Sequence, residues 1–420
     1  MARTIISGVA GLSARLGLTK TKFRAPDGKR QLLVDVSTIA RTDAGTGIQR
    51  VVRALWLQLR ALDRNALIVT PIVASRRSGY RIAPADFLQN PIIADPATLP
   101  PVAIAEGDVF LGLDLALHVI PHRAHELRRW QACGVRLGFV VYDLLPVLHP
   151  YWFSPKINRR YVRWIGVVAR HADEILCIAR AVQDDLENWI EANIPRRIKR
   201  PRMSVIRLGG DIVASAPSEG LPIDAEAVLS WARNRPTILM VGTIEPRKGY
   251  DQALAAFEYL WSEESASVRD LVPSLLIVGR PGWMTEALQD RLRYHREQGR
   301  RLRWIDDASD EYLGKLYEAS TGFLFASQAE GFGLPILEAA GYGKPILARD
   351  LPVFREIAPD GAAFFQATTG EELAGLIKTW LAEITSGKPD LAPSILPDWT
   401  MAAEDLVAAL GLDLPVAGRD

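Results

Sequence analysis

Two glutamates and two glycines share a short segment whose spacing suits a phosphorylated ligand. Glu330 and Glu338 stand eight residues apart, just after an apolar run. Gly331 and Gly333, which lie between them, allow the backbone to approach a ligand closely. Pro335 fits the first position of a helix, whose free amides favour an anion. Both carboxylates can border one pocket, although Glu338 in the first helical turn could instead complement the helix dipole and Glu330 could be loop surface.

Two cations stand beside another glycine turn. Arg247 and Lys248 precede Gly249, where a helix is expected to start. Positive charge at a helix start opposes the helix dipole, so a bound anion explains the pair better than an ordinary solvated surface does. Two adjacent cations can compensate the charge of such an anion without a metal. The chain has no Asp-x-Asp motif, so we expect neither a metal ion nor another cofactor.

Alternating apolar runs predict the elements that position these residues. In the first half the runs are 32–36, 67–73, 109–113, 137–142, 175–178 and 205–208. In the second half they are 238–241, 275–278, 302–305, 322–325, 346–348 and 363–365. Helical stretches separate the runs, a pattern typical of parallel sheets with crossover helices. The predicted fold class is α/β, with two nucleotide-binding-type sheets facing one cleft.

Length and composition agree with two domains and exclude several classes of protein. The 420 residues exceed what one hydrophobic core usually serves, and 48% of them are hydrophobic. A net charge of +1 gives no support to a nucleic-acid binder. Cys133 and Cys177 form no Cys-x-x-Cys, so they predict neither a disulfide framework nor a thiolate zinc site, and a reducing cytoplasm fits. No run approaches the roughly 18 to 20 apolar residues of a membrane span.

Positive charge is concentrated locally. The first thirty residues carry seven cations, namely Arg3, Arg15, Lys20, Lys22, Arg24, Lys29 and Arg30, against Asp27 alone. Further clusters lie within 156–170 and 196–202. Solvated surface is the plain interpretation of each cluster. Together they would suit an anionic bilayer or a diphosphate-bearing acceptor, at roughly 1 kcal/mol per bound cation.

The segment Ala329-Glu-Gly-Phe-Gly-Leu-Pro-Ile-Leu-Glu-Ala resembles the Glu-x7-Glu signature of retaining family 4 glycosyltransferases, which have the GT-B fold. The resemblance extends over most of 236–410. It implies a basic N-terminal extension (1–30), an acceptor-binding Rossmann-like domain (31–215), a linker (216–235), a nucleotide-sugar-binding Rossmann-like domain (236–396) and a C-terminal crossover helix and tail (397–420) that packs back on the first domain.

The resemblance also implies roles for individual residues. Glu338 would bind the nucleotide ribose, and Glu330 would contact hydroxyls of the donor sugar. Arg247 and Lys248 would hold the diphosphate. The implied catalytic set is Glu330, Asp143, Lys248 and Arg247. The donor-binding set is Glu338, Gly331, Phe332, Gly333, Leu334, Gly242, Thr243, Arg280 and Ile305, in which Thr243 replaces a common Arg and Arg280 could equally be loop surface.

Two features of the first half extend the resemblance. The turn Thr46-Gly-Ile-Gln-Arg50 is similar to a turn in family members that build bacterial surface polysaccharides. In those enzymes the turn faces the donor phosphate or the acceptor. Thr46, Gly47 and Arg50 are therefore candidate site residues, although Arg50 could equally pair with an acidic neighbour. Asp143 follows Tyr142 where many relatives have His-Asp. We expect Asp143 to orient the acceptor or the transferred sugar, the alternative being a structural turn cap.

These features predict a retaining glycosyltransferase that moves a hexose or deoxyhexose from a GDP-, UDP- or dTDP-linked donor to a glycan acceptor. Mannose or rhamnose, passed to a lipid-linked acceptor in bacterial surface polysaccharide synthesis, is the expectation by analogy. The expected location is the cytoplasm, either free or peripheral at the inner face of the cell membrane. Two alternatives stay open: a nucleotide-sugar epimerase of the same fold, or a non-catalytic glycan- or nucleotide-binding protein.

Overall fold

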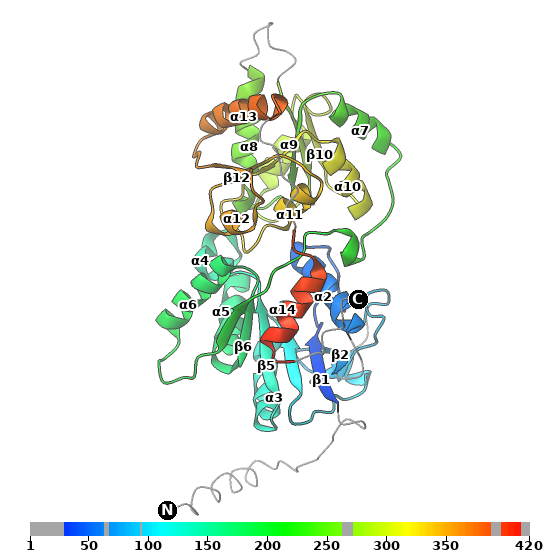
Figure 1. Cartoon of the computed structure of the whole chain (residues 1–420), viewed down its shortest axis with the longest axis vertical. Helices are drawn as coiled ribbons and strands as arrows, with labels where there is room; N and C mark the ends of the chain where they lie inside the picture. The colour runs from blue at the N-terminus through cyan, green and yellow to red at the C-terminus, as the bar shows by residue number, and fades with distance from the viewer. Residues whose placement is uncertain (1–28, 63–66, 93–94, 263–271, 388–395, 413–420) are drawn as a thin grey trace, which may run out of the picture.

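The computed structural model places the chain in two α/β units, one above the other along the long axis (Figure 1). It describes residues 29–62, 67–92, 95–262, 272–387 and 396–412. The predicted N-terminal extension lies outside the described residues except for Lys29 and Arg30, and so do residues 413–420 of the predicted tail.

The first unit is built on a seven-stranded sheet with the order β3-β2-β1-β4-β5-β6-β7. Its strands are β1 (Arg30–Asp35), β2 (Leu67–Val73), β3 (Arg81–Ile82), β4 (Val109–Gly112), β5 (Arg136–Val141), β6 (Glu174–Cys177) and β7 (Arg202–Val205). Its main helices are α2 (Gly47–Ala61), α3 (Ile120–Ala132), α4 (Leu145–Leu148), α5 (Pro155–His171) and α6 (Arg180–Asn193). All neighbouring strands are parallel except β3, which pairs antiparallel with β2.

The second unit has a six-stranded, all-parallel sheet with the order β10-β9-β8-β11-β12-β13. Its strands are β8 (Thr237–Val241), β9 (Ser274–Val278), β10 (Leu302–Ile305), β11 (Gly322–Phe325), β12 (Ile346–Arg349) and β13 (Ala363–Phe365). Its helices are α7 (Ala225–Arg233), α8 (Tyr250–Ser262), α9 (Glu286–Arg293), α10 (Asp310–Ala319), α11 (Leu334–Gly341), α12 (Pro352–Ile357) and α13 (Gly370–Thr385).

Both sheets reverse their strand order near the centre. The reversal falls between β1 and β4 in the first sheet and between β8 and β11 in the second. In open α/β sheets, ligands bind outside the carboxyl ends of the strands at this point. The topology therefore marks one ligand-binding edge on each unit.

The predicted two-sheet α/β fold is confirmed, with one strand misplaced and one missed. The strand expected at 205–208 is β7, which ends at Val205. The amide of Ile206 still donates to the carbonyl of Cys177, but Arg207 turns away and pairs with Asp405 at 2.6 Å. Strand β3 has two residues, too few to produce a periodic signal.

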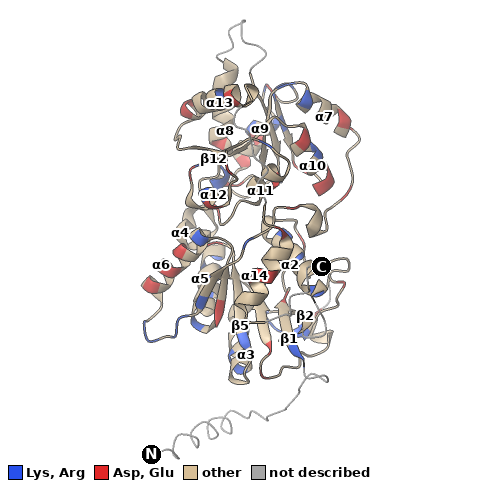
Figure 2. Ribbon diagram, viewed as in Figure 1, with Lys and Arg blue, Asp and Glu red and all other residues tan. Residues whose placement is uncertain are grey.

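The last helix returns to the first unit, as predicted. Helix α14 (Trp399–Ala409) packs on α2 (Figure 1). Trp399 is 1% exposed, and its indole N–H donates to the carbonyl oxygen of Asp211 at 2.9 Å. Charges of both signs are spread over the two units (Figure 2). Within the described ranges, no helix combines the length and hydrophobicity needed to cross a bilayer.

Two buried carboxyl groups hold the loop between β1 and α2. Asp114 accepts hydrogen bonds from the amides of Thr38 and Ile39, both at 2.7 Å. Asp35, at the end of β1, accepts from the hydroxyl of Tyr80 at 2.8 Å. Burial raises the pKa of Asp35 to about 6 and that of Asp114 to about 7, although these hydrogen bonds oppose the shift. Both groups therefore bind protons in the folded state that the unfolded chain has released.

We expect the thermal unfolding midpoint to fall as the pH rises from 4 to 8. The folded-state pKa values exceed the ordinary value of 3.8, so this contribution to stability is complete below pH 4 and is lost as the pH passes through 6 to 7. Asp114→Asn keeps an oxygen for the two amides and removes one titration. Its midpoint should therefore depend less steeply on pH in calorimetry, and a slope equal to that of wild type would contradict the assignment.

Candidate functional site

Loops from the carboxyl edges of the two sheets contact one another at the interface between the units, which is called the cleft below. The loop after β9 contacts those after β1 and β5: Arg280 donates to the carbonyl of Ala44 at 2.6 Å, and the indole of Trp283 donates to the carbonyl of Trp152 at 2.7 Å. The loop after β11 meets the end of β5 at Gly331. The predicted site residues on the two units therefore lie at one interface.

One carboxylate binds both of the predicted phosphate-holding cations. Arg247 and Lys248 occupy a 3₁₀ turn between β8 and α8, and their side chains are only 14% and 12% exposed. Each contacts Glu330 at 2.5 Å, Lys248 through Oε1 and Arg247 through Oε2. Arg247 also contacts Glu245 at 3.0 Å. A positive φ of 72° at Gly249 turns the chain so that it lies against Ala326, next to the loop that carries Glu330.

The cluster is ionised despite its burial. Burial alone would raise the pKa of Glu330, but the charges of Arg247 and Lys248 outweigh it and lower the value to about 2. Burial opposes the charge on Arg247 as well, yet Glu330 and Glu245 raise its pKa. The anion expected beside the two cations is therefore Glu330 in this structure, and the cations are not an ordinary solvated helix start.

Asp143 faces this cluster from the first unit. Burial raises its pKa, Arg247 lowers it, and Glu330 and Glu245 raise it further. Its Oδ1 accepts from the amide of Leu145 at 2.9 Å, so the group also caps a turn, which was the structural alternative. The carboxyl groups of Asp143, Glu245 and Glu330 consequently lie around the two cations.

A glycine allows the two units to touch beside the cluster. A Cβ atom at Gly331 would overlap the carbonyl oxygen of Tyr142 and lie 2.7 Å from the Cβ of Asp143. The close approach that the sequence predicted for a ligand is therefore used here for contact between the units. Phe332, in the loop, and Leu334, the first residue of α11, are both 8% exposed and follow it in the chain.

A second ion-pair cluster crosses the cleft through Arg50. Its guanidinium binds the carboxylates of Glu338 and Asp310 on the second unit. Glu338 is 3% exposed and also accepts from the hydroxyl of Tyr317 at 2.9 Å. Burial opposes the charge on Arg50, but Glu338 and Asp310 raise its pKa. The alternative in which Arg50 pairs with an acidic neighbour is therefore observed, and sequence reasoning missed Asp310.

The structure corrects the placement of Glu338. Helix α11 begins at Leu334, so Pro335 is its second residue and Glu338 its fifth. Glu338 thus lies beyond the first turn and does not cap the helix dipole there. Its burial and its two partners make it part of the cross-cleft contact.

The remaining predicted residues surround these clusters without joining them. The hydroxyl of Thr46 caps α2 by accepting from the amide of Gln49, and Gly47 faces Leu334. Gly242 has a positive φ of 140° and faces Lys248. Three residues lie around the loop after β9, namely Thr243 beside Gly282, Ile305, whose carbonyl accepts from Gly279, and Arg280, which is exposed.

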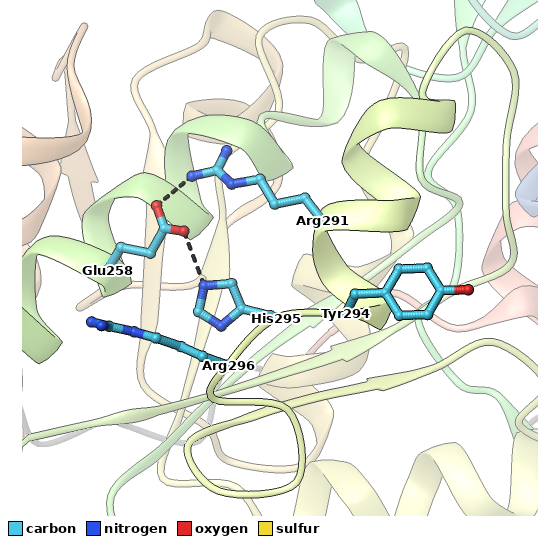
Figure 3. Close-up of a pocket in the computed structure, with 5 residues that line it drawn as sticks. All are labelled: Glu258, Arg291, Tyr294, His295 and Arg296. Carbon is cyan, nitrogen blue, oxygen red and sulfur yellow. Dashed lines mark hydrogen bonds and ion pairs between the residues drawn. The ribbon is translucent and has the colours of Figure 1, made fainter.

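A hollow of about 410 Å³ elsewhere on the second unit has its cations already paired. Figure 3 shows Arg291 and His295 directed at Glu258, while Tyr294 points away. Glu258 lies toward the carboxyl end of α8, and His295 precedes β10, so the hollow is at the edge opposite the cleft. Among the described residues, no three His, Cys, Asp or Glu side chains are grouped as metal ligands.

Comparison with known proteins identifies the family. The profile of "Glycosyl transferases group 1" matches residues 224–386. The chain is 36% identical over 393 residues to the serotype-specific mannosyltransferase WbdA of Escherichia coli, an alignment that covers 92% of this chain and 47% of WbdA. Residues 224–386 form a domain of the group 1 glycosyltransferases. It spans about half the length of the curated relatives that match it along most of its sequence.

Other relatives agree with this family. The chain is 33% identical over 150 residues to O-antigen chain mannosyltransferase B of Escherichia coli, covering 36% of this chain and 37% of that protein. The apo structure of OtsA matches with a TM-score of 0.58 at 13% identity, over 92% of this chain and 100% of OtsA. Anabaena HepE, solved with UDP and glucose, matches with a TM-score of 0.54 at 15% identity, over 90% and 94% of the two chains. The predicted GT-B fold is confirmed.

Gly331→Ala tests the contact between the two units. The added Cβ overlaps the Tyr142 carbonyl, so we expect the units to separate and the radius of gyration measured by solution X-ray scattering to rise. Gly375→Ala is the matched control, because a Cβ there meets open space in α13 and should add stability of up to about 1 kcal/mol. Equal scattering curves for the two variants would contradict the contact.

Proposed function

We propose that the chain transfers a mannosyl residue from a nucleotide sugar, bound by the second unit, to a glycan acceptor bound by the first. The observation that most supports this proposal is the cluster of Arg247, Lys248 and Glu330 at the cleft, with Asp143 opposite. The mannosyltransferases among the relatives support the sugar, and the family supports retention at the anomeric carbon.

Donor binding would rearrange the charge cluster. A diphosphate brings negative charge to Arg247 and Lys248, which can bind its oxygens in place of the Glu330 carboxylate. Glu330 would then be free to accept hydrogen bonds from hydroxyls of the sugar. Glu338 on α11, held in place by Arg50 and Tyr317, would accept hydrogen bonds from the ribose hydroxyls.

The same cations would stabilise the departing diphosphate. The bond between the anomeric carbon and the phosphate oxygen breaks, and the acceptor oxygen forms the new bond from the same face. The acceptor proton passes to an oxygen of the leaving phosphate. Arg247 and Lys248 stabilise the charge that develops on this group, and the buried Asp143 would orient the acceptor or the sugar.

Contacts of the loop after β9 would exclude water from the reaction. Arg280 and Trp283 join this loop to the first unit on either side of it, through Ala44 and Trp152. Closure of this kind limits hydrolysis of an activated donor. The loop would have to open for donor entry and product release.

The acceptor we propose is lipid-linked, and the enzyme would act at the cytoplasmic face of the cell membrane. Helix α5 carries the exposed cations Lys156, Arg159 and Arg163 (Figure 2). Such cations add attraction to an anionic surface at about 1 kcal/mol each. The function of the O-antigen relatives supports an acceptor of surface-polysaccharide type.

Nucleotide binding tests the proposal. Among GDP, UDP and dTDP, we expect one to raise the unfolding midpoint of the wild type, with a gain of about 2.7 kcal/mol at a hundredfold excess over its dissociation constant. Lys248→Ala should abolish most of this shift because it removes a phosphate partner. Lys315→Ala, which removes a lysine of α10 outside the cluster, should retain it. The proposal fails if no nucleotide shifts the wild type or if Lys248→Ala binds as the wild type does.

A further inference from the structure

A hollow of about 340 Å³ in the first unit has the composition of an anion site. It is lined by Arg41, Ser75, Arg76, Arg77, Asp95, Pro96 and His118. Arg41 follows β1, Arg76 and Arg77 follow β2, and His118 follows β4. These are loops at the carboxyl edge of the sheet, around the point where the strand order reverses. The donor site described above uses none of these side chains.

The loop after β2 is fixed so that two arginines stand at its tip. The hydroxyl oxygen of Ser75 accepts from the amides of Arg77 at 3.2 Å and Ser78 at 2.9 Å. Arg123 donates to the carbonyl of Arg76 at 3.0 Å. The backbone is therefore held by local bonds, while both guanidinium groups extend from exposed residues. A preformed loop of this kind lowers the entropy cost of ligand binding.

The hollow has more positive charge than its own carboxylate balances. Asp95 is the carboxylate among its described lining residues, and it already accepts from the hydroxyl of Ser78 at 2.8 Å and the amide of Ala97 at 3.1 Å. Within the described part of the chain, no carboxylate lies within 4 Å of the guanidinium groups of Arg41, Arg76 or Arg77.

The excess positive charge also acts on the neighbouring His118. Burial lowers the pKa of His118, and the positive charges of Arg41, Arg160 and Arg76 lower it further. In the hollow of Figure 3, by contrast, Glu258 pairs with both Arg291 and His295. The two hollows therefore differ in how closely their cations are paired: Arg41 and Arg77 act on Asp95 from beyond ion-pair distance, whereas Arg291 contacts Glu258 directly.

We propose that the hollow around Arg41, Arg76 and Arg77 binds a phosphate or diphosphate group of the acceptor. This inference rests on the proposed function, because it assigns the acceptor's charged group to the unit opposite the donor. A guanidinium group can bind two phosphate oxygens at once. The three arginines also carry more positive charge than the single carboxylate of Asp95 can neutralise. The phosphate could belong to a lipid-linked acceptor or to a soluble phosphorylated one.

Titration with inorganic pyrophosphate tests the site directly. The full chain is saturated with the nucleotide found for the donor site, and pyrophosphate binding is followed by calorimetry. The double variant Arg76→Gln/Arg77→Gln should bind pyrophosphate at least about tenfold more weakly than wild type, because it loses two charge-assisted contacts. Arg291→Gln/Arg296→Gln removes the same charge from the hollow of Figure 3 and should bind as the wild type does.

A second arm distinguishes the two sources of phosphate. Flotation is carried out with phosphatidylcholine vesicles that either contain or lack an isoprenoid diphosphate. If the wild type binds only the vesicles that contain it, and the double variant Arg76→Gln/Arg77→Gln binds neither kind, the phosphate group is lipid-linked. Binding of pyrophosphate without binding of the vesicles that contain the isoprenoid diphosphate assigns a soluble acceptor. The site is refuted if both double variants lose pyrophosphate binding equally or if neither does. Nucleotide binding, measured separately, reports on the proposed function whichever result is found.

Discussion

The buried ion cluster of Arg247, Lys248 and Glu330 at the cleft constrains the conformation of the surrounding loops. Arg247 and Lys248 are withdrawn from water, so each needs an anion within contact distance. Glu330 supplies it, and removal of one partner from such a cluster costs about 3 to 5 kcal/mol because a charge is left uncompensated. The glycines at 249 and 331 follow from this requirement, since each allows a loop to approach the cluster more closely than a side chain would permit.

The topology explains why the cluster lies at an interface. Both sheets present the carboxyl ends of their strands to the cleft, and the loops there carry the charged groups of both units. Arg50 and Asp143 come from the first unit, and their partners or neighbours come from the second. Ligand binding and contact between the units therefore use the same residues. A diphosphate that takes the place of Glu330 would change the balance of charge in both roles at once.

Much of the fold could be predicted from the sequence, because buried parallel strands appear as short apolar runs with helices between them. Strand β7 was misplaced because the apolar run continues past Val205, where Arg207 pairs with the distant Asp405 and ends the ladder. The components of the site could be named from their motifs. Their pairing could not, since the contact of Arg50 with Asp310 joins residues 260 positions apart and leaves no local pattern.

The most direct test of the proposed donor site is a crystal structure of the chain with the nucleoside diphosphate that it binds. We expect the terminal phosphate to lie within hydrogen-bonding distance of Arg247 and Lys248, Glu330 to have left both cations, and the ribose to lie at Glu338. A nucleotide bound with both ion pairs to Glu330 intact, and with its phosphates away from these cations, would contradict the proposed site.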